Sequence, residues 1–138
     1  MAVLTQQQRD AFWRDGYLVA EQAVTPTQLA ALKAEIASWV EQSRAHSAPF
    51  GPPTIDGRPR YDMGVEHTAA KPALRRINNP SDISNAYREV MLDARMVDMV
   101  AELVGPDLKF HHCKINLKLP GAKTEVSYHQ DFSYTPHT

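Results

Sequence analysis

The stretch that most constrains the fold lies near the end of the chain, at residues 108–119, where apolar and polar side chains alternate. The apolar members are Cys113, Ile115, Leu117 and Leu119, and the polar members are His112, Lys114, Asn116 and Lys118. A period of two predicts a β-strand, because successive side chains on a strand point to opposite faces. The apolar face must be covered by other elements. The polar face either lies in water, as on an edge strand, or lines the cavity of a barrel.

Two helices are predicted before this strand by their start and stop signals. Thr5 and Thr25 are each followed three residues later by Gln, which is the pattern of a capping box. We expect a first helix that ends at Gly16, a short buried strand at 17–20, and a second helix that runs to about Arg44. The large apolar side chains of the second helix recur on one stripe: Leu29, Leu32, Ile36, Trp39 and Val40.

Helical patterns return after Ser81, which is predicted to be an N-cap. A break near 92–93 separates two helices, and Gly105 with Pro106 ends the second of them at Val104. The apolar stripe of this second helix consists of Met96, Val97, Val100, Leu103 and Val104.

Residues 46–80 hold six of the ten prolines and show no apolar periodicity. This composition predicts an irregular loop. A loop of this length inside a compact domain is usually functional or disordered. Its large side chains, among them Tyr61, Met63 and Arg76, favour a functional loop.

Length and charge exclude several classes of protein. A chain of 138 residues with 43% hydrophobic and 22% charged residues is typical of one soluble domain. The net charge of -1 gives no reason to expect binding to nucleic acid or to an anionic membrane. No apolar run is long enough to span a bilayer, and the first residues lack the pattern of a signal peptide. With Cys113 as the single cysteine, a reducing cytoplasm is the default location.

The run Tyr128-His129-Gln130-Asp131-Phe132 carries the clearest chemical signal. We expect a strand from Glu125 to Phe132, on which His129 and Asp131 point to the same face. A histidine and a carboxylate on one face provide two of the three ligands of a non-heme Fe(II) site. The motif alone is weak, because His-x-Asp occurs often by chance. Its aromatic neighbours would help to exclude water from a reactive metal.

Three segments together resemble the phytanoyl-CoA dioxygenase family of Fe(II)- and 2-oxoglutarate-dependent oxygenases. They are LTQQQRDAFWRDGYLVAEQAVTPTQLAALKAEI, LRRINNP and KINLKLPGAKTEVSYHQDFSYTPHT, and the resemblance covers nearly the whole chain. It implies an α+β protein built on a double-stranded β-helix, a jelly-roll-like (cupin-like) barrel with N-terminal helices packed on one sheet. The barrel would be incomplete within this chain. One domain, 1–138, is expected, with a helix–strand–helix unit (1–45), a Pro-rich active-site loop (46–80), helices (81–104) and the first core strands (108–138).

The resemblance also assigns roles to individual residues. His129 and Asp131 match the iron ligands of the family. Four residues match positions that approach the cosubstrate 2-oxoglutarate: Asn116, Arg76, Lys114 and His112. Asn116 could instead bond a neighbouring loop, and Arg76 could instead form a solvated surface pair with Arg75. His111 and His112 would form a zinc site only with further ligands, which the sequence does not suggest.

The chain departs from the family pattern at its end. The distal His ligand and the Arg that pairs with the far carboxylate of 2-oxoglutarate are expected beyond Thr138. His137, which follows Pro136, is a poor replacement. We therefore expect a dioxygenase that hydroxylates an unactivated C–H bond of a small molecule, with O2 as second cosubstrate and release of succinate and CO2. The carboxylate of Asp131 favours hydroxylation over halogenation.

Three interpretations of the short chain stay open. It is the N-terminal part of a truncated oxygenase, inactive by itself; or a natural short homologue that acts as a non-catalytic binding or assembly module; or a domain whose barrel a second chain completes. The first predicts unpaired strand edges and exposed apolar helix faces. The sequence does not identify the substrate.

Overall fold

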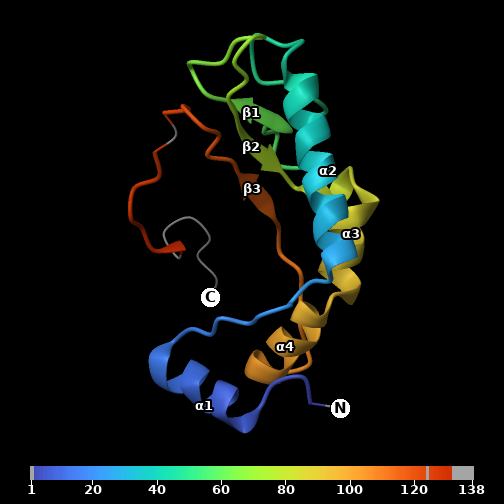
Figure 1. The fold of residues 1–138 in the computed structure, drawn as a ribbon, viewed down its shortest axis with the longest axis vertical. Coiled ribbons are helices and arrows are strands. Elements are labelled where there is room, and N and C mark those ends of the chain that lie inside the picture. Colours follow the sequence, from blue (N-terminus) through green and yellow to red (C-terminus); the bar gives the residue numbers. More distant parts are fainter. Residues whose placement is uncertain (1, 124, 132–138) are drawn as a thin grey trace.

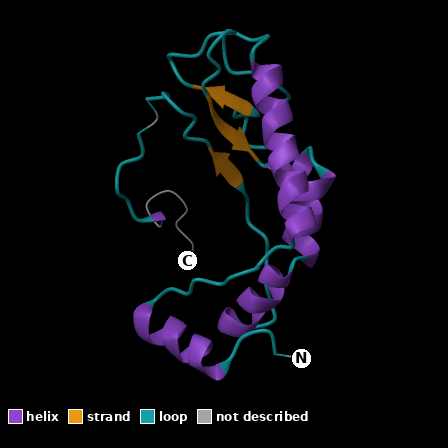
Figure 2. Cartoon of the chain, viewed as in Figure 1, coloured by secondary structure: helices purple, strands orange, loops and turns teal. Residues whose placement is uncertain are grey.

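The computed structural model describes residues 2–123 and 125–131 (Figure 1). The elements in chain order are α1 (Gln6–Asp15), α2 (Pro26–Ser43), β1 (Tyr61–Met63), β2 (Leu74–Asn78), the short 3-10 helix η1 (Pro80–Asp82), α3 (Asn85–Asp93), α4 (Arg95–Val104) and β3 (Lys114–Asn116). Helices α2 and α3 lie along one side of a small sheet (Figure 2), and α1 and α4 lie beyond its end. None of these helices is long and apolar enough to cross a bilayer.

The predicted starts of the first two helices are confirmed. Thr5 and Thr25 each accept a hydrogen bond from a backbone N–H in the first turn, and each forms a complete capping box. Gly16 ends α1 in the left-handed conformation, at φ 80°, which glycine adopts without strain. These ends depend on contacts within a few residues, so a local pattern predicts them well.

Helix α3 begins later in the chain than predicted. Ser84, not Ser81, caps α3 and accepts a hydrogen bond from the N–H of Tyr87. Ser81 lies in η1, which follows the left-handed Asn79. The predicted break is confirmed at Ala94, and Gly105 ends α4 as expected.

The prediction of an irregular loop over residues 46–80 was wrong in part, because 61–63 and 74–78 form two of the three strands, while most of the remaining segment is irregular. β1 pairs antiparallel with β2, and β2 pairs antiparallel with β3, so β2 is the central strand. Strands β1 and β2 are both short, and a bulge lies between Asp62 and Met63. Pairing between distant segments leaves no periodic signal in strands of this length. The short strand expected at 17–20 is also absent from the structure.

The expected strand over 108–119 is correct in its alternation but shorter than predicted. Only Lys114–Asn116 pairs as a strand. The even-numbered residues from 112 to 118 are exposed, and the odd-numbered ones from 113 to 119 are partly buried, as the pattern requires. The strand expected from Glu125 does not form over 125–131, and Phe132 lies outside the described residues.

The core lies between the sheet and helices α2 and α3. Trp39 of α2 packs with Tyr61 of β1 and with Leu74 and Ile77 of β2, and Ile77 is fully buried. The ring of Tyr87 on α3 lies 5.5 Å from that of Trp39, measured between centroids. Burial raises the pKa of the Tyr87 hydroxyl to about 12, so the ring stays neutral in the core.

The predicted stripe of α2 is confirmed at Ile36, Trp39 and Val40, which face the core, but Leu29 at its start is exposed. The predicted stripe of α4 is wrong in part. Met99 is the buried residue of this helix, and Val100 and Val104 are exposed.

The N-terminal segment is attached to α4. The carboxylate of Glu102 accepts the backbone N–H groups of Val3 (2.6 Å) and Leu4 (3.1 Å), and it pairs with Arg9 (3.1 Å). These bonds lower the pKa of Glu102, the bond from Val3 most of all. The architecture is therefore α+β with an open three-stranded sheet, which does not close into a barrel within the described part of the chain.

Candidate functional site

The polar face of the sheet is built by the register between its central strand and β3. Arg76 is the partner of Asn116, and Asn78 is the partner of Lys114. Opposed residues in an antiparallel pair share one face, so these four side chains lie on the side away from Ile77 and Ile115. Arg76 donates from Nε to Oδ1 of Asn116 at 3.1 Å, which orients the asparagine amide.

The His-x-Asp motif forms a compact pair although its backbone is not a strand. Nε2 of His129 lies 3.3 Å from Oδ1 of Asp131. Nδ1 of His129 contacts the backbone carbonyl of Ser127 at 2.7 Å. A carbonyl only accepts hydrogen bonds, so Nδ1 carries the proton in this contact, and Nε2 is the ring nitrogen that faces Asp131.

One cavity of about 1090 Å³ joins the predicted site residues. All six lie on its wall: His129, Asp131, Asn116, Arg76, Lys114 and His112. They come from β2, from β3 with the segment before it, and from the segment 125–131, which lies apart from the sheet in the ribbon (Figure 1). The structure thus brings together residues that the resemblance had assigned to one site.

The geometry of the His129–Asp131 pair fits a shared divalent metal ion. Nitrogen and oxygen ligands bind such ions at about 2.0–2.2 Å, and two ligands at right angles then lie about 3 Å apart. The observed 3.3 Å between Nε2 and Oδ1 is close to this separation. A hydrogen bond from the second ring nitrogen to a carbonyl is the usual way to orient a metal-binding histidine.

A third metal ligand is not supplied by the residues that the structure describes, among which no group of three His, Cys, Asp or Glu side chains could hold a metal ion. His111 and His112 contact each other through their Nδ1 atoms. His137 lies outside the described residues.

Sequence reasoning missed one wall of the cavity, the turn Thr54–Arg58. It contributes Ile55, Asp56 and Arg58 to the lining. The run Thr-Ile-Asp-Gly-Arg between prolines is a turn signal that could have been recognised. Its place in the lining of the same cavity as His129 and Asp131 depends on the tertiary fold. Asn78, Asn79 and Cys113 were missed in the same way.

Arg60 is a buried cation with a structural role. Its guanidinium donates to the carbonyls of Asn78 and Asn79, both at 2.9 Å, and pairs with Asp82 at 2.9 Å. It thereby connects the end of β2 to η1 and the start of β1.

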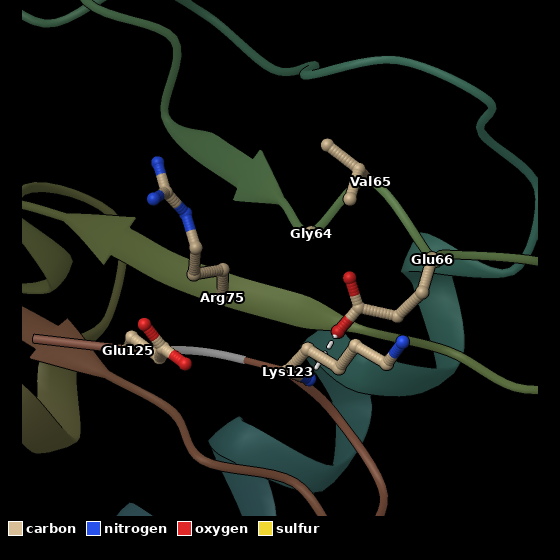
Figure 3. Close-up of a pocket in the computed structure, with 6 residues that line it drawn as sticks. All are labelled: Gly64, Val65, Glu66, Arg75, Lys123 and Glu125. Atoms are coloured by element: carbon tan, nitrogen blue, oxygen red, sulfur yellow. Dashed lines mark hydrogen bonds between the residues drawn. The ribbon is translucent and has the colours of Figure 1, made fainter.

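A smaller pocket of about 280 Å³ lies beside β1 and β2 (Figure 3). Glu66, Arg75, Lys123 and Glu125 line it with Gly64 and Val65. The backbone N–H of Lys123 donates to Oε1 of Glu66 at 2.7 Å, drawn as a dashed line in Figure 3. This bond is the main cause of the lowered pKa of Glu66. It attaches the segment that leads to His129 to the loop after β1.

Comparisons with known proteins identify the family of the chain. The model of the phytanoyl-CoA dioxygenase (PhyH) family matches residues 12–138. A curated protein of Stutzerimonas stutzeri, named probable alpha-ketoglutarate-dependent hypophosphite dioxygenase, is 34% identical over 78 residues, which are 56% of this chain and 27% of that protein. The chain thus spans about a quarter of the length of this relative. No solved structure matches the chain.

Proposed function

The chain belongs to the phytanoyl-CoA dioxygenase family, and we propose that it contributes the Fe(II)- and 2-oxoglutarate-binding part of a dioxygenase that oxidises a small molecule. The observation that carries the proposal is the His129–Asp131 pair, with its oriented imidazole, in the same cavity as the cationic face of the sheet. A histidine and a carboxylate in one cavity with Arg76 and Lys114 suit a metal that must bind an anionic keto acid beside its protein ligands.

The residues of the chain have separate tasks in this proposal. His129 and Asp131 hold the metal. Arg76 and Lys114 neutralise the negative charge of 2-oxoglutarate, and the Asn116 amide, fixed by Arg76, donates to one of its oxygen atoms. His112 lies at the edge of the same face. Bound Fe(II) would supply the oxidative decarboxylation of 2-oxoglutarate with O2, which yields succinate and CO2 and oxidises the substrate.

The remainder of the site is also a proposal. We propose that further strands close the open sheet into a jelly-roll barrel and supply the distal His and the second Arg. These strands belong either to the same chain or to a second chain. The 138 residues alone are then expected to be inactive. A cytoplasmic location stays a prediction.

The chemistry of the oxidised bond has two candidates. We expect hydroxylation of a C–H bond, as in the family to which the chain is similar. The name of the Stutzerimonas stutzeri relative refers to hypophosphite, so oxidation of a P–H bond is the second candidate. Hypophosphite is therefore one of the first substrates to test.

The proposal is tested by release of succinate from 2-oxoglutarate by the full-length protein. Release should require added Fe(II) and O2, and His129→Ala should reduce it at least 100-fold because one of the metal ligands is lost. His46→Ala is a matched control, since His46 stacks on Phe50 away from the cavity. Succinate release that persists in His129→Ala would refute the assigned metal site. Release by the 138-residue chain itself would refute the expected inactivity.

A further inference from the structure

The turn Thr54–Arg58 forms the wall of the cavity to which the proposed function assigns no role. The polar sheet face serves the cosubstrate, and the His129–Asp131 pair serves the metal. The turn places Ile55, Asp56 and Arg58 in the same lining. A substrate bound in this cavity beside the His129–Asp131 pair can therefore contact the turn.

Hydrogen bonds around a buried threonine hold the turn in one conformation. Thr54 is only 5% exposed, and its backbone N–H donates to the carbonyl of Arg58 at 2.9 Å. The N–H of Arg58 donates back to the Thr54 hydroxyl at 3.2 Å, and the N–H of Gly57 donates to the Thr54 carbonyl at 2.9 Å. Gly57 has φ 75°, which favours glycine. The backbone that carries Arg58 is therefore positioned before any ligand binds.

The side chain of Arg58 keeps much of its binding capacity. Its Nε lies 3.0 Å from Oδ2 of Asp56, in a pair whose side chains are 67% and 50% exposed. An exposed pair of this kind contributes little stability, so an incoming anion can replace the aspartate at small cost. The second oxygen of Asp56 accepts from the Thr54 hydroxyl, which is the main cause of its lowered pKa. Asp56 thus has a partner of its own after Arg58 is released.

The lining as a whole suits a polar substrate. Among the described residues, Ile55 and Val126 are its aliphatic side chains, and amides, imidazoles and charged groups form most of the rest. A hydrocarbon chain in this space would leave these polar groups without partners, which is costly. A substrate that carries oxygen atoms would satisfy them.

We propose that Arg58 binds an anionic oxygen group of the substrate, so that the substrate is a small carboxylate or phosphorus oxyanion. The planar guanidinium fork matches both groups with two parallel hydrogen bonds. This proposal rests on the proposed function, because it concerns the substrate of the same site. It separates Arg58, which would select the substrate, from Arg76, which is assigned to the cosubstrate.

Binding is measured without turnover, by saturation-transfer NMR on the methyl protons of acetate, methylphosphonate and acetamide. The full-length protein is kept under nitrogen and measured first without and then with saturating 2-oxoglutarate, so that the second measurement has the cosubstrate site filled. At least one of the two anions should bind, and neutral acetamide should not. Arg58→Gln should reduce the affinity for the anion at least ten-fold, and Arg58→Lys should reduce it less. Asp56→Asn should increase this affinity. Lys118→Gln, an exposed cation that does not line the cavity, is the control.

Several results would overturn the proposal. The anion could bind Arg58→Gln as tightly as the wild type, acetamide could bind as tightly as the anions, or neither anion could bind. A fourth such result is that the anion binds the protein alone but is lost when 2-oxoglutarate is added. The last result would assign Arg58 to the cosubstrate. If only one anion depends on Arg58, its chemistry identifies the substrate group. Arg58-dependent binding without any release of succinate would reject the proposed function alone, because the binding measurement needs no catalysis.

Discussion

At the scale of single residues, Arg75 and Arg76 are neighbours in the chain but have different surroundings. Arg75 pairs with Asp62 and lines the smaller pocket, while Arg76 donates to Asn116 and lines the larger cavity. The sequence left open whether Arg76 forms a solvated surface pair with Arg75. In the structure Arg75 has its partner on β1 and Arg76 has its partner on β3.

This difference gives a matched pair of substitutions. Arg76→Gln should raise the KM for 2-oxoglutarate about 10- to 100-fold, since a hydrogen bond to a charged group contributes about 1.5–3 kcal/mol. Arg75→Gln removes the same charge from the adjacent position and should leave this KM within about two-fold. The measurement is succinate release by the full-length protein at varied 2-oxoglutarate. An equal rise in both variants would mean that overall charge, and not the Arg76–Asn116 pair, binds the cosubstrate.

At the scale of elements, the segment after β3 is attached through Glu66. Its carboxylate accepts the N–H of Lys123, eight residues before Asp131. Glu66→Ala should therefore accelerate hydrogen exchange at the Lys123 amide and weaken Fe(II) binding several-fold. Glu66→Gln should preserve most of both, because its neutral side-chain carbonyl still accepts, although more weakly than a carboxylate. Glu41→Ala, which breaks an exposed pair with Arg44, is the control.

The same bond predicts a pH dependence. The pKa of Glu66 is lowered in the folded chain, mainly by the Lys123 N–H. The ionised Glu66 carboxylate therefore contributes its full stabilisation of the folded chain above the ordinary glutamate pKa of about 4.3. This stabilisation is lost as the pH falls through the lowered pKa. Protection of the Lys123 amide should decline in this acidic range in the wild type and stay unchanged in Glu66→Gln. Equal acid sensitivity of both proteins would assign the loss to other groups.

At the scale of the whole molecule, one sheet separates an apolar core from a polar cavity. Ile77 and Ile115 face α2 and α3, and Arg76 and Asn116 face the cavity. Ile77→Ala should lower the free energy of unfolding by about 2–5 kcal/mol, because the fully buried side chain leaves a cavity. Lys118→Ala, at an exposed position after β3, should change it by less than about 0.5 kcal/mol. Urea denaturation measures both, and a loss below about 1 kcal/mol for Ile77→Ala would place the core elsewhere.

Local signals predicted a substantial part of this architecture. The capping boxes at Thr5 and Thr25 and the stop at Gly16 depend on hydrogen bonds between near neighbours, so sequence patterns identify them. The alternation over 112–119 correctly assigned each side chain to its face. The His-x-Asp motif identified two residues whose side chains are close, with Nε2 of His129 3.3 Å from Oδ1 of Asp131. The prediction of a strand there was wrong over 125–131.

By itself the sequence determined the starts of the first two helices, the two faces of the last strand and the metal-binding candidates, because each is encoded within one short segment or one motif. It also determined the family, through several such segments along the chain. Only the tertiary structure decided that 46–80 supplies β1 and β2, that Arg60 is buried, and that the turn Thr54–Arg58 lines the same cavity as His129. These features require pairing between segments distant in sequence. Their free energy comes from burial and hydrogen bonds that no local pattern records.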